Sequence, residues 1–171
     1  IQSVGVFVDA GTDEILKLYN DGIIDVAQLH GMESEDYIKT LKEKGIYDNA
    51  LISYISDHGD MLGDHYHWRK TYPYQGSVHV PYIVKWPASY HFTKGNKITQ
   101  PVELRDLLPT FLEIAGSSIP QDMDGQSLLR LMEGKTDQWR KYIDLEHATC
   151  YSPDNYWCAL TDGKIKYIWR F

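Results

Sequence analysis

The sequence predicts an α/β fold, and three observations lead to that prediction. A long stretch of helical apolar spacing ends at Gly45, a compact apolar run follows at 50–55, and a polar Ser-Asp-His-Gly segment comes directly after that run. Helix, glycine stop, buried strand and polar loop in this order are typical of α/β domains. Ligand sites in open α/β sheets gather beyond the carboxyl ends of strands, so the loop at 56–60 is where chemistry is expected.

The elements before Gly45 follow from their apolar spacing. Residues 4–8 are a short apolar run of strand character, and the turn-rich stretch at 9–13 follows them. From residue 14 to residue 44, apolar residues recur at roughly helical spacing, and Gly22 and Gly31 interrupt the pattern. We expect one long, kinked helix here, or two helices.

The elements after Gly45 are shorter. A turn is expected at 47–49, and residues 50–55 form the buried strand. A second strand is expected at 80–87, where the two prolines indicate an edge position or strand ends. The remaining predictions are helices at 104–115 and 127–132, and short strands at 142–145, 156–160 and 165–169.

Composition narrows the function classes. The chain has 171 residues, of which 43% are hydrophobic, so one compact domain with a core is the default. Its net charge of -7, with no basic run, argues against a nucleic-acid surface and favours a cation as partner. No segment approaches the roughly 20 apolar residues of a membrane span. Cys150 and Cys158 have neither zinc-knuckle nor redox-pair spacing, and they are either free or bonded.

Asp57 and His58 are the candidate metal ligands. They are adjacent at a predicted strand end, and Gly59 permits the sharp bend that would turn both side chains toward one cation. A carboxylate suits Ca²⁺ or Mg²⁺ and an imidazole favours Zn²⁺ or Mn²⁺, so the pair does not name the metal. An isolated pair is more often a turn cap beside a solvated histidine. The dense group of ionisable neighbours favours a site: Asp60, Asp64, His65, His67, Arg69 and Lys70.

Lys70 and His147 are the candidates for contact with a substrate. Lys70 offers a compact ammonium that can bind a tetrahedral anion and stabilise charge on its oxygens, and its alternative is an ordinary surface lysine. Glu146 and His147 follow a predicted strand and can face a leaving group, although a hydrogen-bonded strand-end histidine is the commoner case.

An ordered series of motifs resembles the later half of the type I sulfatases, from about Tyr19 to Ile168. Such a series is far more specific than any one of its parts. The motifs are Tyr47-Asp48-Asn49-Ala50-Leu51, Ser56-Asp57-His58-Gly59-Asp60-Met61-Leu62-Gly63-Asp64-His65, Trp68-Arg69-Lys70, Tyr74-Gln75-Gly76-Ser77, Val80-Pro81, Asp106-Leu107-Leu108-Pro109-Thr110, Ala115-Gly116, Asp124-Gly125-Gln126-Ser127-Leu128, Trp139-Arg140 and Lys166-Tyr167-Ile168.

The resemblance implies an alkaline-phosphatase-like α/β sandwich with a mixed sheet and flanking helices. Residues 1–116 would be the C-terminal part of the catalytic domain, and residues 117–171 the beginning of a smaller C-terminal subdomain. Such enzymes hydrolyse sulfate esters with a divalent cation, usually Ca²⁺, and a formylglycine made from Cys or Ser. The resemblance gives Asp57 and His58 the role of metal ligands, His58 standing where other members use Asn, and Lys70 that of the catalytic lysine on the sulfate group. His65 and His147 are the further substrate-binding candidates.

The departures from the family pattern predict a fragment. The sequence has no Cys/Ser-x-Pro/Ala-x-Arg motif and lacks the paired aspartates that complete the metal site. We therefore expect a missing N-terminal part of the same protein to supply the nucleophile, and the fragment alone to have no turnover on a sulfated small molecule or glycan. The family resemblance implies a periplasmic, lysosomal or secreted location, for which the sequence has no signal of its own.

Two alternatives stay open. A phosphonate or phosphodiester hydrolase of the same superfamily would share the Asp-His-Gly loop and a comparable lysine. A catalytically silent binding domain would explain the missing motifs, but it would have no chemical reason to keep Asp57, His58 and Lys70.

Overall fold

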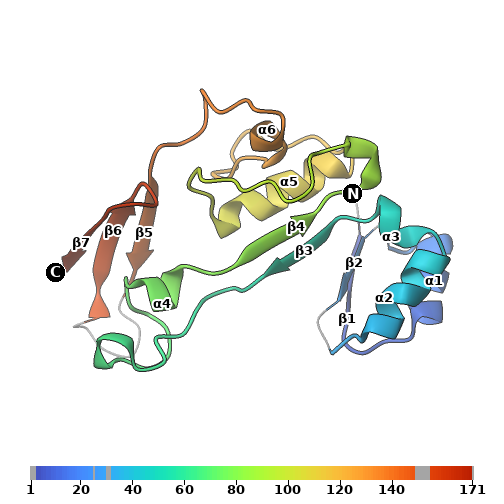
Figure 1. The fold of residues 1–171 in the computed structure, drawn as a ribbon, viewed down its shortest axis with the longest axis horizontal. Helices are drawn as coiled ribbons and strands as arrows, with labels where there is room; N and C mark the ends of the chain where they lie inside the picture. The colour runs from blue at the N-terminus through green and yellow to red at the C-terminus, as the bar shows by residue number, and fades with distance from the viewer. Residues whose placement is uncertain (1–2, 25, 30–31, 149–154, 171) are drawn as a thin grey trace. The chain divides into compact units, whose positions relative to one another are not determined.

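The computed structural model describes residues 3–24, 26–29, 32–148 and 155–170. These residues divide into two compact units, the first made of Ile1–Ile52 with Val84–His91 and the second of Ser53–Ile83 with Phe92–Phe171. The elements are mixed α and β, as the sequence predicts (Figure 1).

The first unit is built on a parallel strand pair with helices on one side (Figure 1). Val4 of the first strand lies opposite Val26 of the second. Phe7, Ile15 and Ile24 form the buried centre of this unit, because alternate strand residues and one helix stripe turn inward together. In chain order the elements are β1 (Val4–Phe7), α1 (Thr12–Asn20), β2 (Val26–Leu29), α2 (Glu35–Glu43) and α3 (Ile46–Asn49), with a 3-10 turn at Ala88–Tyr90.

Of the two expectations for residues 14–44, two helices are found, α1 and α2, and a single kinked helix is not; the strand β2 that separates them was not predicted. Helix α1 ends where Gly22 takes a left-handed φ of 69°. Ile23, Val26 and Leu29 are spaced three residues apart, which imitates a helical stripe across a turn and a four-residue strand. The strand is too short to display an alternation of its own.

The expected turn at 47–49 is instead the short helix α3, which follows Gly45 at a φ of 74°. The strand predicted at 50–55 is confirmed as β3 (Ile52–Ile55), and the one predicted at 80–87 as β4 (Tyr82–Lys85). β3 and β4 pair in a two-stranded sheet (Figure 1). Pro81 and Pro87 lie just outside β4, so the prolines mark strand ends.

The second unit contains the predicted helices in shortened form. Glu103 and Asp106 form a capping box at the start of the first one, and left-handed Gly116 and Gly134 follow the ends. The elements are a 3-10 turn at Asp64–Tyr66, α4 (Gln75–Val78), a 3-10 turn at Leu104–Asp106, α5 (Leu107–Ile114) and α6 (Leu129–Met132).

Three antiparallel strands close the second unit, confirming the strands expected there. They are β5 (Ile143–His147), β6 (Trp157–Thr161) and β7 (Lys166–Arg170), with His147 opposite Trp157. Ile143, Trp157 and Ala159 are buried on one face of this sheet.

A buried ion pair organises the polypeptide around α5. Asp106 is 0% exposed and binds both terminal nitrogens of Arg140 at 2.6 Å. Its carboxylate also accepts hydrogen bonds from the backbone N–H groups of Gln126 at 2.8 Å and Glu103 at 3.0 Å. With four donors around it, Asp106 holds three segments of the second unit together and has a structural role.

In the part of the chain that the structure describes, no helix combines the length and apolar character that a bilayer crossing requires. Cys158 on β6 is a free thiol, and Cys150 lies outside the described residues.

Candidate active site

The predicted metal ligands lie in a tight turn at the carboxyl end of β3. The hydroxyl of Ser56 donates to the carbonyl oxygen of His58 at 2.7 Å, and the backbone N–H of His58 donates to Oδ1 of Asp57 at 3.0 Å. Gly59 then passes against the backbone of Gly76, where an added Cβ would lie 2.0 Å from a carbonyl oxygen. Only glycine fits there, so the bend that brings Asp57 and His58 together depends on residue 59.

The ring of His58 is held with one nitrogen on the backbone and the other toward the site. Nδ1 lies 2.8 Å from the carbonyl oxygen of Gly59, which can only accept, so the proton is assigned to Nδ1. Nε2 therefore presents a lone pair, 3.4 Å from Oδ2 of Asp57 and 3.0 Å from Nζ of Lys70. The three residues that the sequence singles out for metal and sulfate thus meet at one point.

The side chains of Asp57 and His58 are suited to bind a divalent cation. A histidine ligand usually donates its second ring N–H to a carbonyl or carboxylate, and Gly59 supplies that acceptor here. The carboxylate of Asp57 is open to solvent, with 82% of its side chain exposed. Among the described residues no group of three or more His, Cys, Asp or Glu is gathered closely enough to hold a metal.

Lys70 lies between two residues in rare backbone conformations. Arg69 has a φ of 69° and Thr71, a β-branched residue, a φ of 86°. The Arg69 side of this segment is fixed by Asp60, whose Oδ1 accepts the backbone N–H of Arg69 at 3.1 Å, and by Met61, whose N–H donates to the Arg69 carbonyl at 2.8 Å. Such strain persists only when the surroundings impose it, and it is common at functional sites.

The Thr71 side of the segment is fixed from β6. The indole Nε1 of Trp157 donates to the carbonyl oxygen of Thr71 at 2.8 Å, and the amide of Asn155 donates to its hydroxyl at 2.9 Å. The backbone carbonyl of Asn155 lies 3.0 Å from Nδ1 of His147. His147 is therefore connected to the residue next to Lys70, although it lies 77 positions later in the chain. Sequence reasoning missed Asn155 and Trp157; a buried indole that needs an acceptor was the available signal for Trp157.

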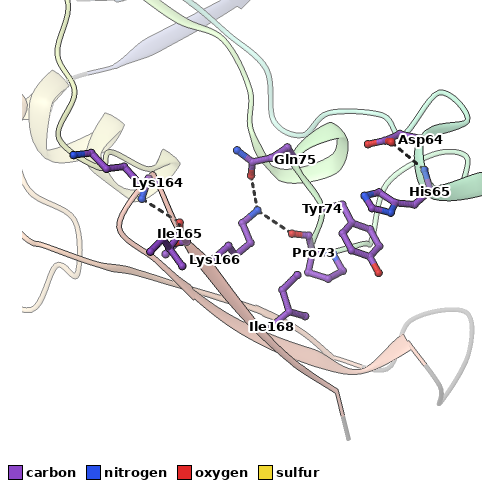
Figure 2. Close-up of a pocket in the computed structure, with 11 residues that line it drawn as sticks. Asp64, His65, Pro73, Tyr74, Gln75, Lys164, Ile165, Lys166 and Ile168 are labelled. Atoms are coloured by element: carbon purple, nitrogen blue, oxygen red, sulfur yellow. Dashed lines mark hydrogen bonds between the residues drawn. The ribbon is translucent and has the colours of Figure 1, made fainter.

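His65 lies in a separate pocket of about 300 Å³ in the second unit (Figure 2). Its ring stacks on Tyr74 with centroids 4.1 Å apart. The ammonium of Lys166 donates to the carbonyl of Pro73 at 2.9 Å and to Oε1 of Gln75 at 2.5 Å, and burial lowers the pKa of Lys166 below its usual value. The lining residues are Asp64, His65, Pro73, Tyr74, Gln75, Thr161, Gly163, Lys164, Ile165, Lys166 and Ile168. Asp57, His58 and Lys70 are not among them, so the pocket is distinct from the point where those three meet.

Two family models match different parts of the chain. Residues 63–152, just over half of it, match the model described as N-sulphoglucosamine sulphohydrolase, C-terminal. Residues 1–57 match the model described as N-(5'phosphoribosyl)anthranilate (PRA) isomerase.

Individual proteins resemble most of the chain. An arylsulfatase of Clostridium perfringens is 38% identical over 134 residues, 78% of this chain and 27% of the relative. The phosphonate monoester hydrolase of Silicibacter pomeroyi has a TM-score of 0.67 at 31% identity over 79% of this chain and 29% of its own. A structure solved in complex with its substrate D-glucosamine-2-N,6-O-disulfate has a TM-score of 0.62 at 26% identity over 78% and 28% of the two chains. The chain thus spans less than a third of each of these relatives.

Proposed function

Because the chain belongs to the sulfatase family of the alkaline phosphatase superfamily, we propose that the complete protein is a sulfuric ester hydrolase to which this chain contributes part of the active site. The observation that carries the proposal is the meeting of Asp57, His58 and Lys70 at one point. A carboxylate, an imidazole with a fixed tautomer and an ammonium are together suited to a cation and the anionic group that it binds.

Asp57 and His58 are the residues that would hold the divalent metal, for which the family resemblance favours Ca²⁺. When bound, the metal polarises an oxygen of the ester group as a Lewis acid. The chain's own contribution is orientation. The Gly59 carbonyl fixes the His58 ring, and the Asp57 carboxylate is held by the His58 backbone N–H, so neither ligand has to be ordered when the cation arrives.

Lys70 is proposed as the residue that contacts the sulfate group. An ammonium gives three donors and a full positive charge, which stabilise the charge that grows on the ester oxygens as the sulfur–oxygen bond breaks. The ammonium donates to His58 Nε2 at 3.0 Å, so a sulfate oxygen would take over one of its hydrogen bonds. The constrained backbone at Arg69 and Thr71 holds Lys70 at the position where that exchange occurs.

His147 and His65 are proposed to bind other parts of the substrate. Asn155 contacts both His147 and Thr71, the residue that follows Lys70. His65 lines the pocket with Tyr74, and a stacked pair of rings beside Gln75 and Lys166 suits a polar sugar or an aromatic aglycone. The substrate would therefore be a sulfated small molecule or glycan.

The nucleophile is proposed to lie outside this chain. A formylglycine would come from the Cys/Ser-x-Pro/Ala-x-Arg motif, which the sequence does not contain. The partner required for turnover is the N-terminal part of a sulfatase, and the chain by itself is expected to be inactive.

Phosphonate monoester hydrolysis is the second candidate. It is supported by the 31% identity and TM-score of 0.67 to the Silicibacter pomeroyi enzyme. Sulfate esters and phosphonate monoesters share a tetrahedral anionic centre, so Lys70 would act in the same way on either.

A hybrid enzyme tests the two candidates. Residues 46–171 would replace the corresponding part of the Clostridium perfringens arylsulfatase, with folding checked by circular dichroism. We expect hydrolysis of 4-nitrophenyl sulfate above that of 4-nitrophenyl phenylphosphonate. The reverse preference would support the second candidate, and a folded hybrid active on neither compound, with the parent arylsulfatase active, would count against both.

A further inference from the structure

The first 45 residues of the chain follow a repeated β-α-β-α pattern. β1 leads to α1, β2 to α2, and the two strands are parallel in the register Val4–Val26 to Phe7–Leu29. The core of Phe7, Ile15 and Ile24 closes without any residue beyond Tyr37. Two successive βα steps on a parallel pair are a unit of a repeating α/β fold.

Within the described residues of the first unit, helices cover one face of the β1–β2 pair (Figure 1). Phe7 is buried against the helices, whereas its neighbours Val6 and Val8 point to the other face and are 61% and 62% exposed. Parallel sheets are ordinarily covered on both faces, which is why their strands are apolar throughout. The run Val-Gly-Val-Phe-Val is thus typical of a strand in a parallel sheet larger than this two-stranded pair.

The comparisons divide the chain in the same region. The PRA isomerase model matches residues 1–57 and the sulphohydrolase model residues 63–152, with no overlap. The arylsulfatase, the phosphonate monoester hydrolase and the disulfate-bound structure cover 78%, 79% and 78% of the chain. Each alignment leaves about a fifth of the chain uncovered, which is shorter than the first 45 residues. The arylsulfatase alignment of 134 residues is 8 longer than residues 46–171, so it includes a few residues before residue 46.

We infer that the chain joins parts of two unrelated enzymes, with residues up to about Gly45 from a βα-repeat fold of the PRA isomerase type and the sulfatase part beginning at about Ile46. Gly45, with its left-handed φ of 74°, ends the last repeat. The motif Tyr47-Asp48-Asn49-Ala50-Leu51, the first of the sulfatase-like series with a compact match, starts directly after it. The isomerase match extends to residue 57 and so overlaps this motif, which locates the joint only to the region between about residues 38 and 57.

The inference changes how the predicted domains are drawn. The catalytic part predicted at 1–116 would begin near residue 46, and the sulfatase resemblance would no longer extend back to Tyr19. It also means that the sulfatase N-terminal part with its nucleophile would not lie directly upstream of Ile1, so the turnover proposed above would need that part as a separate polypeptide.

The first test is single-molecule sequencing of the transcript across codons 40–52 and upstream of Ile1. We expect one open frame through the joint, preceded by further βα repeats of the isomerase type. Two early aspartates and a Cys/Ser-x-Pro/Ala-x-Arg motif directly upstream of Ile1 would overturn the inference. Reads that never cross codons 45 and 46 would overturn the claim of a single polypeptide.

The second test measures whether the two parts unfold separately in the full chain. Ile15→Asp disrupts the core of the first segment, and Leu129→Asp is the matched change in the second unit, since both residues are buried at 6% and 4% exposure. We expect hydrogen exchange in Ile15→Asp to rise at least about tenfold in residues 3–44 and to stay unchanged in residues 104–147. Faster exchange in both regions would contradict independent folding of the two parts. Ile15→Ala provides the same readout if Ile15→Asp does not accumulate.

Discussion

The ammonium nitrogen of Lys70 lies 3.0 Å from Nε2 of His58, and Oδ2 of Asp57 lies 3.4 Å from the same ring nitrogen. At this distance the Lys70 ammonium donates one hydrogen bond to the Nε2 lone pair of His58. A ligand that accepts this hydrogen bond in place of His58 leaves the lone pair free. Anion binding at Lys70 and cation binding at His58 would therefore assist each other.

Lys70→Ala in the hybrid arylsulfatase is expected to lower kcat by about 10²–10³, because the charge that stabilises the ester oxygens is lost. Lys70→Arg should not restore the rate, since a planar guanidinium cannot take the place of a compact ammonium. Lys94→Ala, at an exposed lysine outside the site, is the control for removal of a positive charge. Steady-state rates on 4-nitrophenyl sulfate decide the matter, and a loss below threefold would remove Lys70 from the catalytic group.

Gly59→Ala is expected to destabilise the second unit by on the order of 2–3 kcal/mol, because the new methyl group meets the Gly76 carbonyl oxygen at 2.0 Å. The backbone of residue 59 has to move, and Asp57 and His58 move with it. Gly11→Ala is the matched control, since no atom lies within 4 Å of a Cβ added there. Thermal unfolding by circular dichroism measures both variants, and equal midpoints would show that the close approach is absent in solution.

Trp157→Phe tests whether β6 holds the Lys70 segment. It keeps the buried ring but removes the donor to the Thr71 carbonyl, and we expect kcat of the hybrid to fall about tenfold. Trp139→Phe removes an equivalent indole bond, 2.9 Å to the Pro101 carbonyl, at a place away from the site. Both variants should lose about 1 kcal/mol of stability. A rate loss shared by the two would mean that stability alone is being measured.

Asp106→Asn is expected to cost about 3 kcal/mol, because the buried carboxylate that binds both terminal nitrogens of Arg140 is lost and only Glu103, at 3.1 Å, still pairs with the guanidinium. Glu113→Gln, an exposed carboxylate on α5, should change stability by less than about 0.5 kcal/mol. Urea unfolding followed by the tryptophan fluorescence of the chain reports the difference. Similar midpoints for the two variants would contradict the structural role of Asp106.

The Arg105–Asp144 pair predicts an acid dependence of stability. The hydrogen bond from Arg105 lowers the pKa of Asp144 below its usual value of 3.8, so the folded state binds the proton more weakly than the unfolded state. The stabilisation is therefore full above pH 3.8 and is lost as pH falls through the lower, folded pKa. Because Asp144 is largely exposed, the effect stays below about 1 kcal/mol.

The measurement for this pair is the unfolding midpoint of the wild type and of Asp144→Asn from about pH 6 down to about pH 2.5. The gap between them should narrow only below pH 3.8. Asp137→Asn, at an exposed carboxylate before Trp139, provides the reference. A gap that stays constant with pH would show that the ion pair contributes nothing.

Local patterns were sufficient for the elements whose ends carry a chemical marker. Gly116 and Gly134 take positive φ after the two predicted helices, and Asp162 and Gly163 form the turn that separates β6 from β7. Strand β2 was missed because it is four residues long and its apolar residues fall at helical spacing.

The candidate site was predictable only where it is local in sequence. Asp57 and His58 are adjacent, and Lys70 is 12 positions away in the same loop region, so motif order pointed to all three. Asn155 and Trp157 act on Thr71 across 84 and 86 positions. No periodicity records such a contact, because it depends on how β6 packs against a loop rather than on either segment alone.

The bond from the Trp157 indole to Thr71 also limits how specificity can be exchanged among related enzymes. A loop that presents its lysine between two left-handed residues keeps its shape only with its own β6 strand behind it. Transplanting the lysine loop without that strand would keep its side chains but let its backbone relax. The two segments therefore have to be inherited together. A library that recombines such enzymes should place its crossover points outside 60–157.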